Sequence, residues 1–162
     1  MITIRRIKSG EAELFRQIRL RALQEAPYAF SSTYESAIQR SAESWREQAE
    51  GSAQGSDRAT FFAFSEDLPI GIAALYRLEG QADAGEVLQV WVAPEFRGTR
   101  VAWDLMDAVF KWAAENNFRR ISAGVTKVNP RALKFYRNYG FSVIDEPLPN
   151  DSDCLNLVKK IN

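Results

Sequence analysis

Hydrophobic and polar residues along the chain repeat with two different periods, and the order of these periods predicts the order of the elements. Short runs of aliphatic and aromatic residues, bounded by Gly, Pro, Asn or Asp, predict strands. We expect strands over residues 2–7, 60–64, 70–78, 86–92, 119–126, 141–144 and 154–158. The second and third runs are separated only by a short polar stretch and Pro69, so they should form a hairpin.

Apolar residues at helical spacing, together with capping signals, predict four helical segments. We expect them after Gly10 up to about Pro27, from the capping run at residues 31–33 through Arg46, over residues 99–117, and from Pro130 to Gly140. The last segment is sharply delimited, because Asn129 is a natural N-cap, Pro130 favours the first helical position and Gly140 accommodates a left-handed C-cap. The Gly- and Ser-rich residues 51–57 should form a loop.

In order, the predicted elements are β-α-α-β-β-β-α-β-α-β-β. Neighbouring early strands would pair as antiparallel hairpins, whereas the β-α-β crossover in the second half would make one strand pair parallel. The chain has no internal repeat, and its 162 residues suit a single domain. We therefore expect one α/β (α+β) domain over residues 1–162, with a mixed, mostly antiparallel sheet and helices on both faces.

Composition restricts the chemistry open to this fold. The chain has 21 basic and 21 acidic side chains, no histidine and one cysteine, Cys154. The lack of histidine excludes a Ser-His-Asp or Cys-His nucleophile pair, and one cysteine excludes an intramolecular disulfide, a four-cysteine zinc site or an iron–sulfur cluster. With a net charge of zero, the chain lacks the overall positive charge that would attract nucleic acid or an anionic membrane. With no apolar signal peptide and no membrane-length apolar run, we expect a cytoplasmic protein without a metal.

The junction between the predicted strand 86–92 and the helix 99–117 is the first candidate site. A strand that runs through a short loop into a helix presents free backbone N–H groups and the positive end of the helix dipole, and such a site can bind phosphate. Gly98 would let a ligand approach the backbone, and Arg97 and Arg100 would add positive charge. An ordinary strand–helix turn with solvated arginines explains the same residues equally well.

The second candidate is the segment from Asn129 to Phe141. Tyr136 lies in the middle of its amphipathic helix, where an aromatic residue is more often part of the core than of a site. Asn129 is fully explained as a helix cap. Taken alone, this segment therefore carries a weaker functional signal than the first.

The two segments together resemble the GNAT superfamily of acyl-CoA-dependent N-acetyltransferases. That family has a strand ending in Val-x-Pro, then Arg/Gln-x-x-Gly-x-Gly/Ala at the start of a long helix, and about 30 residues later an Asn followed by Ala-x-x-x-Tyr-x-x-x-Gly-Phe. The matching residues are Val92-Ala93-Pro94, Arg97, Ala102, Asn129, Ala132, Tyr136 and Gly140-Phe141. Arg100 departs from the usual loop glycine, and would be strained if that position needed a positive φ.

The resemblance implies that acetyl-CoA is the co-substrate. It implies that the backbone of Val90, Trp91 and Val92 pairs with the pantetheine arm, that Asn129 contacts that arm, and that Tyr136 protonates the leaving thiolate. It also implies a pyrophosphate cradle at the start of the long helix, formed by Arg97, Gly98, Thr99, Arg100, Val101, Ala102 and Trp103.

The amine must lose a proton before it attacks, and the resemblance implies Glu86 as a base that acts through water. Strand alternation would place Glu86 on the same face as Leu88, Val90 and Val92. An exposed glutamate at a strand start explains Glu86 equally well. A ping-pong route would need Cys154 as the nucleophile, but no histidine is present to activate it, so direct attack by the amine is favoured.

The acceptor would be a small molecule, a peptide or a protein. In relatives the first two helices shape its site, which points weakly to Tyr28, Phe30 and Tyr34, although aromatic packing between helices explains them too. Two chains could form a homodimer, as relatives often do. The rival interpretations are a non-catalytic acyl-CoA sensor or scaffold, and a nucleotide- or flavin-binding α/β domain. The second rival lacks a Gly-x-Gly-x-x-Gly or Walker A motif.

Overall fold

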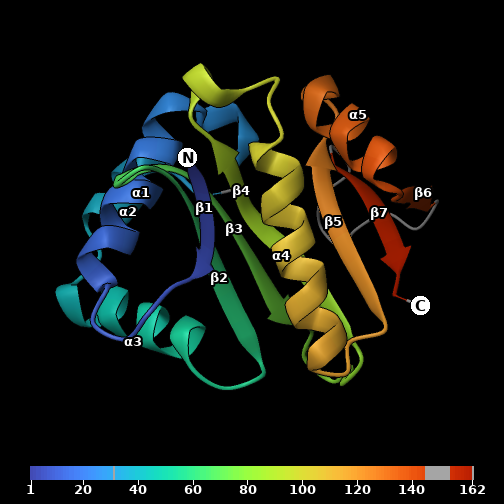
Figure 1. Cartoon of the computed structure of the whole chain (residues 1–162), viewed down its shortest axis with the longest axis horizontal. Coiled ribbons are helices and arrows are strands. Elements are labelled where there is room, and N and C mark those ends of the chain that lie inside the picture. The colour runs from blue at the N-terminus through green and yellow to red at the C-terminus, as the bar shows by residue number, and fades with distance from the viewer. Residues whose placement is uncertain (31, 145–153, 162) are drawn as a thin grey trace.

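The computed structural model describes residues 1–30, 32–144 and 154–161, and seven strands form one sheet in the order β1-β2-β3-β4-β5-β7-β6 (Figure 1). The strands are β1 (Ile2–Arg6), β2 (Arg58–Ser65), β3 (Leu68–Arg77), β4 (Ala84–Val92), β5 (Arg120–Thr126), β6 (Ser142–Ile144) and β7 (Cys154–Lys160). The helices are α1 (Ala12–Glu25), α2 (Tyr34–Ile38), α3 (Ala42–Ala53), α4 (Val101–Glu115) and α5 (Pro130–Tyr139), with short 3-10 turns η1 (Pro27–Ala29) and η2 (Pro94–Phe96).

The pairing of the strands confirms the predicted mixed sheet. β4 and β5 pair in parallel, and every other neighbouring pair in the sheet is antiparallel. The crossover between the parallel strands is α4, as the β-α-β pattern predicts. Each predicted strand is present, with bounds that differ by at most two residues at either end.

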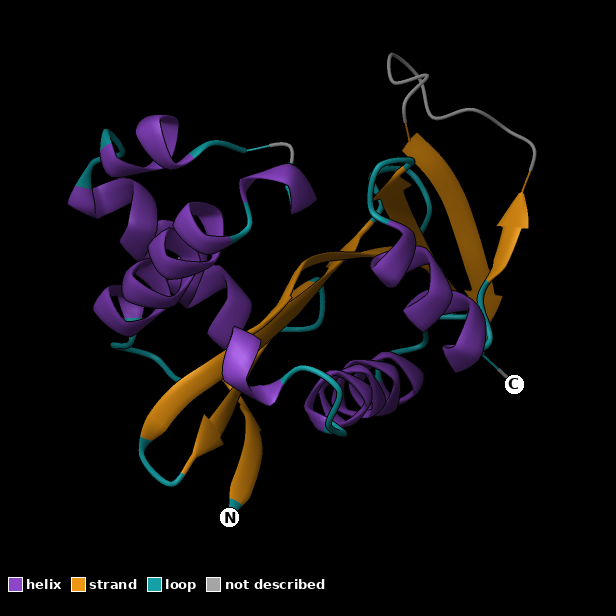
Figure 2. Cartoon of the chain, turned by 90° about the horizontal axis from the view of Figure 1, so that it is seen from above, coloured by secondary structure: helices purple, strands orange, loops and turns teal. Residues whose placement is uncertain are grey.

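Helices cover both faces of the sheet (Figure 2). The first three helices pack on one face, and α4 and α5 pack on the other. The core fills both interfaces, with Phe15 and Leu23 of α1 fully buried on one side and Leu105 and Met106 of α4 on the other. Within the described ranges, none of the helices combines the length and the apolar character needed to cross a membrane.

The region between α1 and β2 corrects two predictions. The segment predicted to be one helix is two, because Thr33 caps α2 and Ser41 caps α3 by accepting backbone N–H bonds at 3.1 Å each. Residues 51–53, predicted to lie in a loop, instead form the last turn of α3. Packing explains this: Ser52 continues the buried stripe of α3, and the Arg58 guanidinium lies against Gly51 in the space that a Cβ would take.

β4 carries one extra residue where it passes β3. Leu88 lies opposite Ala74 and Trp91 lies opposite Ile72, so a step of three residues on β4 matches a step of two on β3. Gln89, within that step, has a φ of 59°. This is a β-bulge, and it re-aims the side chains that follow it.

The bulge overturns one expectation about Glu86. Residues directly opposite in an antiparallel pair share a face, so Trp91 lies on the face of Glu86 although simple alternation would separate them. Val90 and Val92 therefore point to the other face, toward α4. The prediction that Glu86 shares a face with Val90 and Val92 is wrong, because a positive-φ residue inside the strand resets the alternation.

Candidate active site

A cleft of about 750 Å³ opens where the end of β4, the start of α4 and one side of α5 meet. Both sequence segments singled out above line it, although 25 residues of the chain lie between Trp103 and Asn129. The predicted residues among its walls are Val90, Trp91, Val92, Arg97, Gly98, Thr99, Arg100, Ala102, Trp103, Asn129 and Tyr136. Val101 is the one predicted loop–helix residue that does not line the cleft, because its side chain is turned into the core.

The cleft exists because β4 and β5 diverge. Their parallel pairing covers Ala84–Val87 and Arg120–Ala123, and β5 then continues with β7 up to Thr126. Within the described chain, residues 88–92 therefore have no strand partner on the β5 side. A strand edge of this kind presents backbone N–H and C=O groups to whatever occupies the gap.

The start of α4 supplies unpaired backbone N–H groups on the same side. Arg100 is its N-cap and provides no side-chain cap. The Val101 N–H donates to the Thr99 hydroxyl at 3.4 Å, which leaves the N–H groups of Ala102 and Trp103, both at the cleft wall, without a partner among the described residues. Gly98 has a φ of 82°, whereas Arg100 has a φ of −84°. The loop thus requires glycine at position 98 and not at position 100, and the arginine at the family's usual glycine position is unstrained.

Arg97 lines the cleft, but its guanidinium is engaged with the protein itself. It donates to the Val92 carbonyl at 3.1 Å and pairs with the Glu25 carboxylate at the end of α1. The indole of Trp91 donates to the same carboxylate at 2.9 Å. Burial raises the pKa of Glu25, but the hydrogen bonds from Arg97 and Trp91 outweigh that effect and lower the pKa overall. Arg97 therefore fixes the loop between β4 and α4 to α1.

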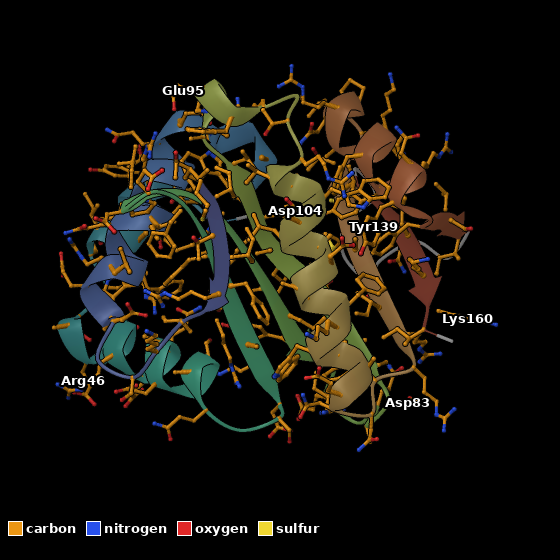
Figure 3. All side chains as sticks on the ribbon, in the orientation of Figure 1. Arg46, Asp83, Glu95, Asp104, Tyr139 and Lys160 are labelled. Atoms are coloured by element: carbon orange, nitrogen blue, oxygen red, sulfur yellow. The ribbon has the colours of Figure 1, made fainter. Side chains whose placement is uncertain are left out.

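Aromatic packing fixes α5 against α4 and so sets the far wall of the cleft. The ring of Tyr139 lies 4.7 Å from that of Trp103 and 5.3 Å from that of Phe110. Its hydroxyl points from α5 toward α4 (Figure 3) and donates to Asp107 at 2.7 Å. A rigid α5 matters because it carries Tyr136 into the cleft.

Tyr136 has a buried ring and a hydroxyl at the cleft wall. The ring packs on Phe135 and Phe141, with centroid distances of 5.5 and 5.2 Å. Tyr136 is therefore both a core residue, through its ring, and a cleft residue, through its hydroxyl. Its hydroxyl forms no hydrogen bond to any described residue. Burial raises its pKa above the ordinary value, which keeps the phenol protonated and available as a hydrogen-bond donor.

Asn129 has the cap geometry that the sequence predicts. Its side-chain oxygen accepts from the Ala132 N–H at 3.2 Å, and Pro130 and the left-handed Gly140 bound the helix as expected. That bond uses the amide oxygen, so the amide NH₂ remains as a donor at the cleft wall.

Glu86 lies outside the cleft lining, on the face of the sheet covered by the first three helices. It is half-buried and lies opposite Tyr76 on β3. Burial raises the pKa of its carboxyl group. Phe30 and Tyr34, also half-buried, lie outside the lining as well, and the side chain of Tyr28 is outside the described part of the structure.

Sequence reasoning missed several cleft residues. Those on α5 follow helical spacing around the matched motif, so a helical projection from Asn129 would have found most of them. Ala26 and Ala29 at the end of α1 carried no such signal, because only tertiary packing brings them there. The missed residues are Ala26, Ala29, Phe96, Arg131, Ala132, Lys134, Phe135 and Asn138. Among the described residues, His, Cys, Asp and Glu side chains form no cluster of three able to hold a metal.

Comparison with known proteins agrees with this architecture. The acetyltransferase (GNAT) family profile matches residues 19–141. None of the curated proteins compared with the chain matches it in sequence.

Solved structures share the fold over nearly the whole chain. The PaiA N-acetyltransferase from Thermoplasma acidophilum, determined in complex with coenzyme A, superposes with a TM-score of 0.82 at 22% identity, covering 99% of each chain. A GNAT-family acetyltransferase from Streptococcus pneumoniae gives 0.80 at 16% identity, covering 99% of this chain and 100% of that one. The GNAT domain of PAT from S. lividans gives 0.77 at 20% identity, covering 98% and 89%.

Proposed function

Because the chain belongs to the GNAT acetyltransferase family, we propose that it transfers an acetyl group from acetyl-CoA to a primary amine by direct attack. The observation that carries this proposal is the cleft itself. It joins an open strand edge on β4, an uncapped helix start on α4 and the phenol of Tyr136 around one space. Each of these features suits a different part of an acyl-CoA.

The open edge of β4 is suited to the pantetheine arm, whose amides can pair with residues 88–92 as an added strand would. The start of α4 is suited to the pyrophosphate, because its free N–H groups and helix dipole attract anions. The Arg100 side chain is 74% exposed and its Nε lies 3.7 Å from the Asp104 carboxylate, which leaves its terminal nitrogens to reach phosphate groups at the mouth. Arg97, already paired with Glu25, would act through its backbone and by holding the loop.

In the chemical step, the amine lone pair attacks the thioester carbonyl carbon, the C–N bond forms and the carbonyl electron pair moves to oxygen. The nitrogen then loses a proton to water, the C=O bond re-forms, and the C–S bond breaks with its electron pair going to sulfur. A backbone N–H of β4 would stabilise the oxyanion. Tyr136 would donate a hydrogen bond to the departing sulfur. With its pKa raised by burial, this phenol is better suited to sharing its proton with a thiolate than to releasing it fully.

Glu86 is the proposed base, acting through water on the ammonium group of the acceptor. Burial raises the pKa of this carboxyl group, which makes it a stronger base than an exposed glutamate. The bulge places it on the face of Trp91, so the acceptor would approach from the side of the first three helices. Acetyl-CoA would lie along the open edge of β4, where its thioester can meet the amine.

A thermal-shift panel with acetyl-CoA, CoA, NAD, ATP and FMN tests the binding half of this proposal. A true ligand stabilises the folded protein by RT ln(1 + [L]/Kd) and so raises Tm as its concentration increases; we expect shifts with the two CoA species alone. A shift only with NAD, ATP or FMN would favour a nucleotide- or flavin-binding domain. Shifts with CoA species but no thiol release from acetyl-CoA across an amine library would favour the sensor alternative.

A further inference from the structure

Arg19, in the middle of α1, is a buried cation with no counter-ion among the described residues. The residue is 6% exposed, and its guanidinium forms no hydrogen bond to any residue that the structure describes. Its Nη1 atom is fully buried. The other inward-facing arginines differ: Arg5 pairs with Glu11, and Arg97 pairs with Glu25. Burying a charged guanidinium with one amino group wholly shut off from water and unbonded is costly, so this arrangement needs an explanation.

The surroundings of Arg19 make its charge more costly still. Its guanidinium lies over the Phe30 ring, 4.9 Å from the centroid, which offers only a cation–π contact. The ionisable groups that influence it are Tyr76 and a second cation, Arg40, and no carboxylate of the described residues is among them. Burial lowers the pKa of Arg19 to about 10, so it still carries its charge at neutral pH.

Arg40 shows the same lack of a counter-ion. Its guanidinium stacks on the Trp45 ring at 3.9 Å and donates only to Ser44. Burial lowers its pKa, and the one opposing influence comes from Tyr76. Tyr76 influences the pKa of both guanidinium groups, and no carboxylate of the described residues neutralises either of them.

Tyr76 also connects this pair of cations to the proposed base. It lies opposite Glu86 in the β3–β4 register, so both residues share the sheet face that the first three helices cover. Gln48 of α3 donates to the Tyr76 hydroxyl at 2.9 Å and holds it between the helices and the sheet. One face of the sheet thus presents a half-buried carboxylate and, beyond Tyr76, unpaired positive charge.

We infer that the acetyl acceptor is a small primary amine that also carries an oxyanion group, a carboxylate or a phosphate, which Arg19 binds while Glu86 faces the amine. This rests on the proposed function. A planar guanidinium presents a fork of N–H donors that matches both oxyanions. Binding one would supply the counter-ion that Arg19 lacks, with Arg40 reinforcing the attraction. Phe30, predicted weakly as a substrate residue, then serves as the platform that orients Arg19.

A stability measurement tests whether Arg19 is a site residue or part of the structural core. Arg19→Met keeps the length and apolar contacts of the side chain but removes the unpaired charge. If Arg19 awaits a ligand, the variant should have a higher Tm than the wild type in the absence of substrate. A Tm well below that of the wild type would mean that the guanidinium stabilises the fold as it stands, and would overturn the inference.

Acceptor preference tests the ligand directly. Thiol release from acetyl-CoA is measured with matched amines: amino acids, their decarboxylated counterparts and the corresponding aminoalkyl phosphates. We expect wild-type kcat/KM to favour the carboxylate or phosphate member of each set, and Arg19→Met to lower that preference by about 10- to 100-fold. Arg16→Met is the control, because Arg16 lies on the same helix but is partly exposed beside Glu13, and it should keep the preference.

The outcomes separate this inference from the proposed function. Equal turnover of neutral and oxyanion-bearing amines, or the same preference in Arg19→Met, would overturn the inference and leave the acetyltransferase proposal intact. No thiol release by the wild type with any amine would count against the acetyltransferase proposal itself. The Tm of Arg19→Met would still decide whether Arg19 is an uncompensated cation.

Discussion

At the scale of single residues, Tyr136 combines a packed ring with a free hydroxyl, and these two roles can be separated. Tyr136→Phe keeps the contacts with Phe135 and Phe141 and removes only the hydrogen-bond donor. We expect kcat to fall by about 10²-fold or more, with little change in acetyl-CoA affinity or Tm. Steady-state kinetics and calorimetry measure the two effects. An unchanged kcat would remove Tyr136 from the mechanism.

Protonation of Glu86 should make kcat/KM fall at low pH, which forms the acid limb of the pH profile. As pH falls through the raised pKa of this carboxyl, which lies above the ordinary 4.5, the base is protonated and kcat/KM should decrease. Glu86→Gln should lower kcat/KM and remove that limb from the pH profile. If the variant keeps both full activity and the limb, Glu86 is not the base.

The same group gives a stability prediction with a definite sign. Because the folded-state pKa of Glu86 is raised, its contribution to stability is present below the unfolded-state pKa and is lost as pH rises through the folded-state value. Glu86→Gln lacks this titration, so its Tm should exceed that of the wild type more at pH 7 than at pH 4. If the Tm of the wild type and of Glu86→Gln changed with pH in parallel between pH 4 and pH 7, burial would not raise the pKa of Glu86.

At the scale of elements, the loop before α4 depends on the left-handed conformation of Gly98. A Cβ at this position would meet no atom within 4 Å, so Gly98→Ala tests backbone strain alone. We expect a loss of about 1 kcal/mol in the free energy of unfolding and weaker acetyl-CoA binding. Gly80→Ala is the matched control, since Gly80 has a φ of 77°, equally open space and no contact with the cleft. It should lose similar stability and bind acetyl-CoA normally.

The hydrogen bonds from α1 to that loop are a second requirement at this scale. Glu25→Gln weakens the bonds that hold Arg97 and Trp91, so it should cost about 1–2 kcal/mol and lower acetyl-CoA affinity. Glu95→Gln is the control, because the Glu95 side chain is 64% exposed and lies 3.5 Å from Arg21 at the surface (Figure 3). Equal acetyl-CoA affinity in both variants would show that the loop holds its shape without Glu25.

At the scale of the whole molecule, the sequence was enough to predict the sheet, its one parallel pair and the position of each strand, because these follow from local periodicity and from the rules of chain connection. It also predicted most of the cleft residues on β4 and α4, because they are consecutive in the chain. The extent of α3 was missed, since Arg58 packing on Gly51 is a tertiary contact.

The features that the sequence could not supply are those that depend on register and burial. The bulge at Gln89 reverses the faces of Val90 and Val92 relative to Glu86, and the alternation of residue types does not reveal it. The partnership of Arg97 with Glu25 and the isolation of Arg19 both depend on how α1 lies on the sheet. They determine which arginines hold the structure together and which remain for a ligand.

The central claim is that the cleft between β4, α4 and α5 delivers the acetyl group of acetyl-CoA to an amine. Its most direct test is thiol release from acetyl-CoA by the wild-type protein across a library of primary amines, with mass spectrometry of the amine and with Tyr136→Phe in parallel. We predict amine-dependent thiol release, an acetylated amine and a strongly reduced rate in the variant. Acetyl-CoA that stays intact with every amine, or is hydrolysed without any acetylated product, would contradict the claim.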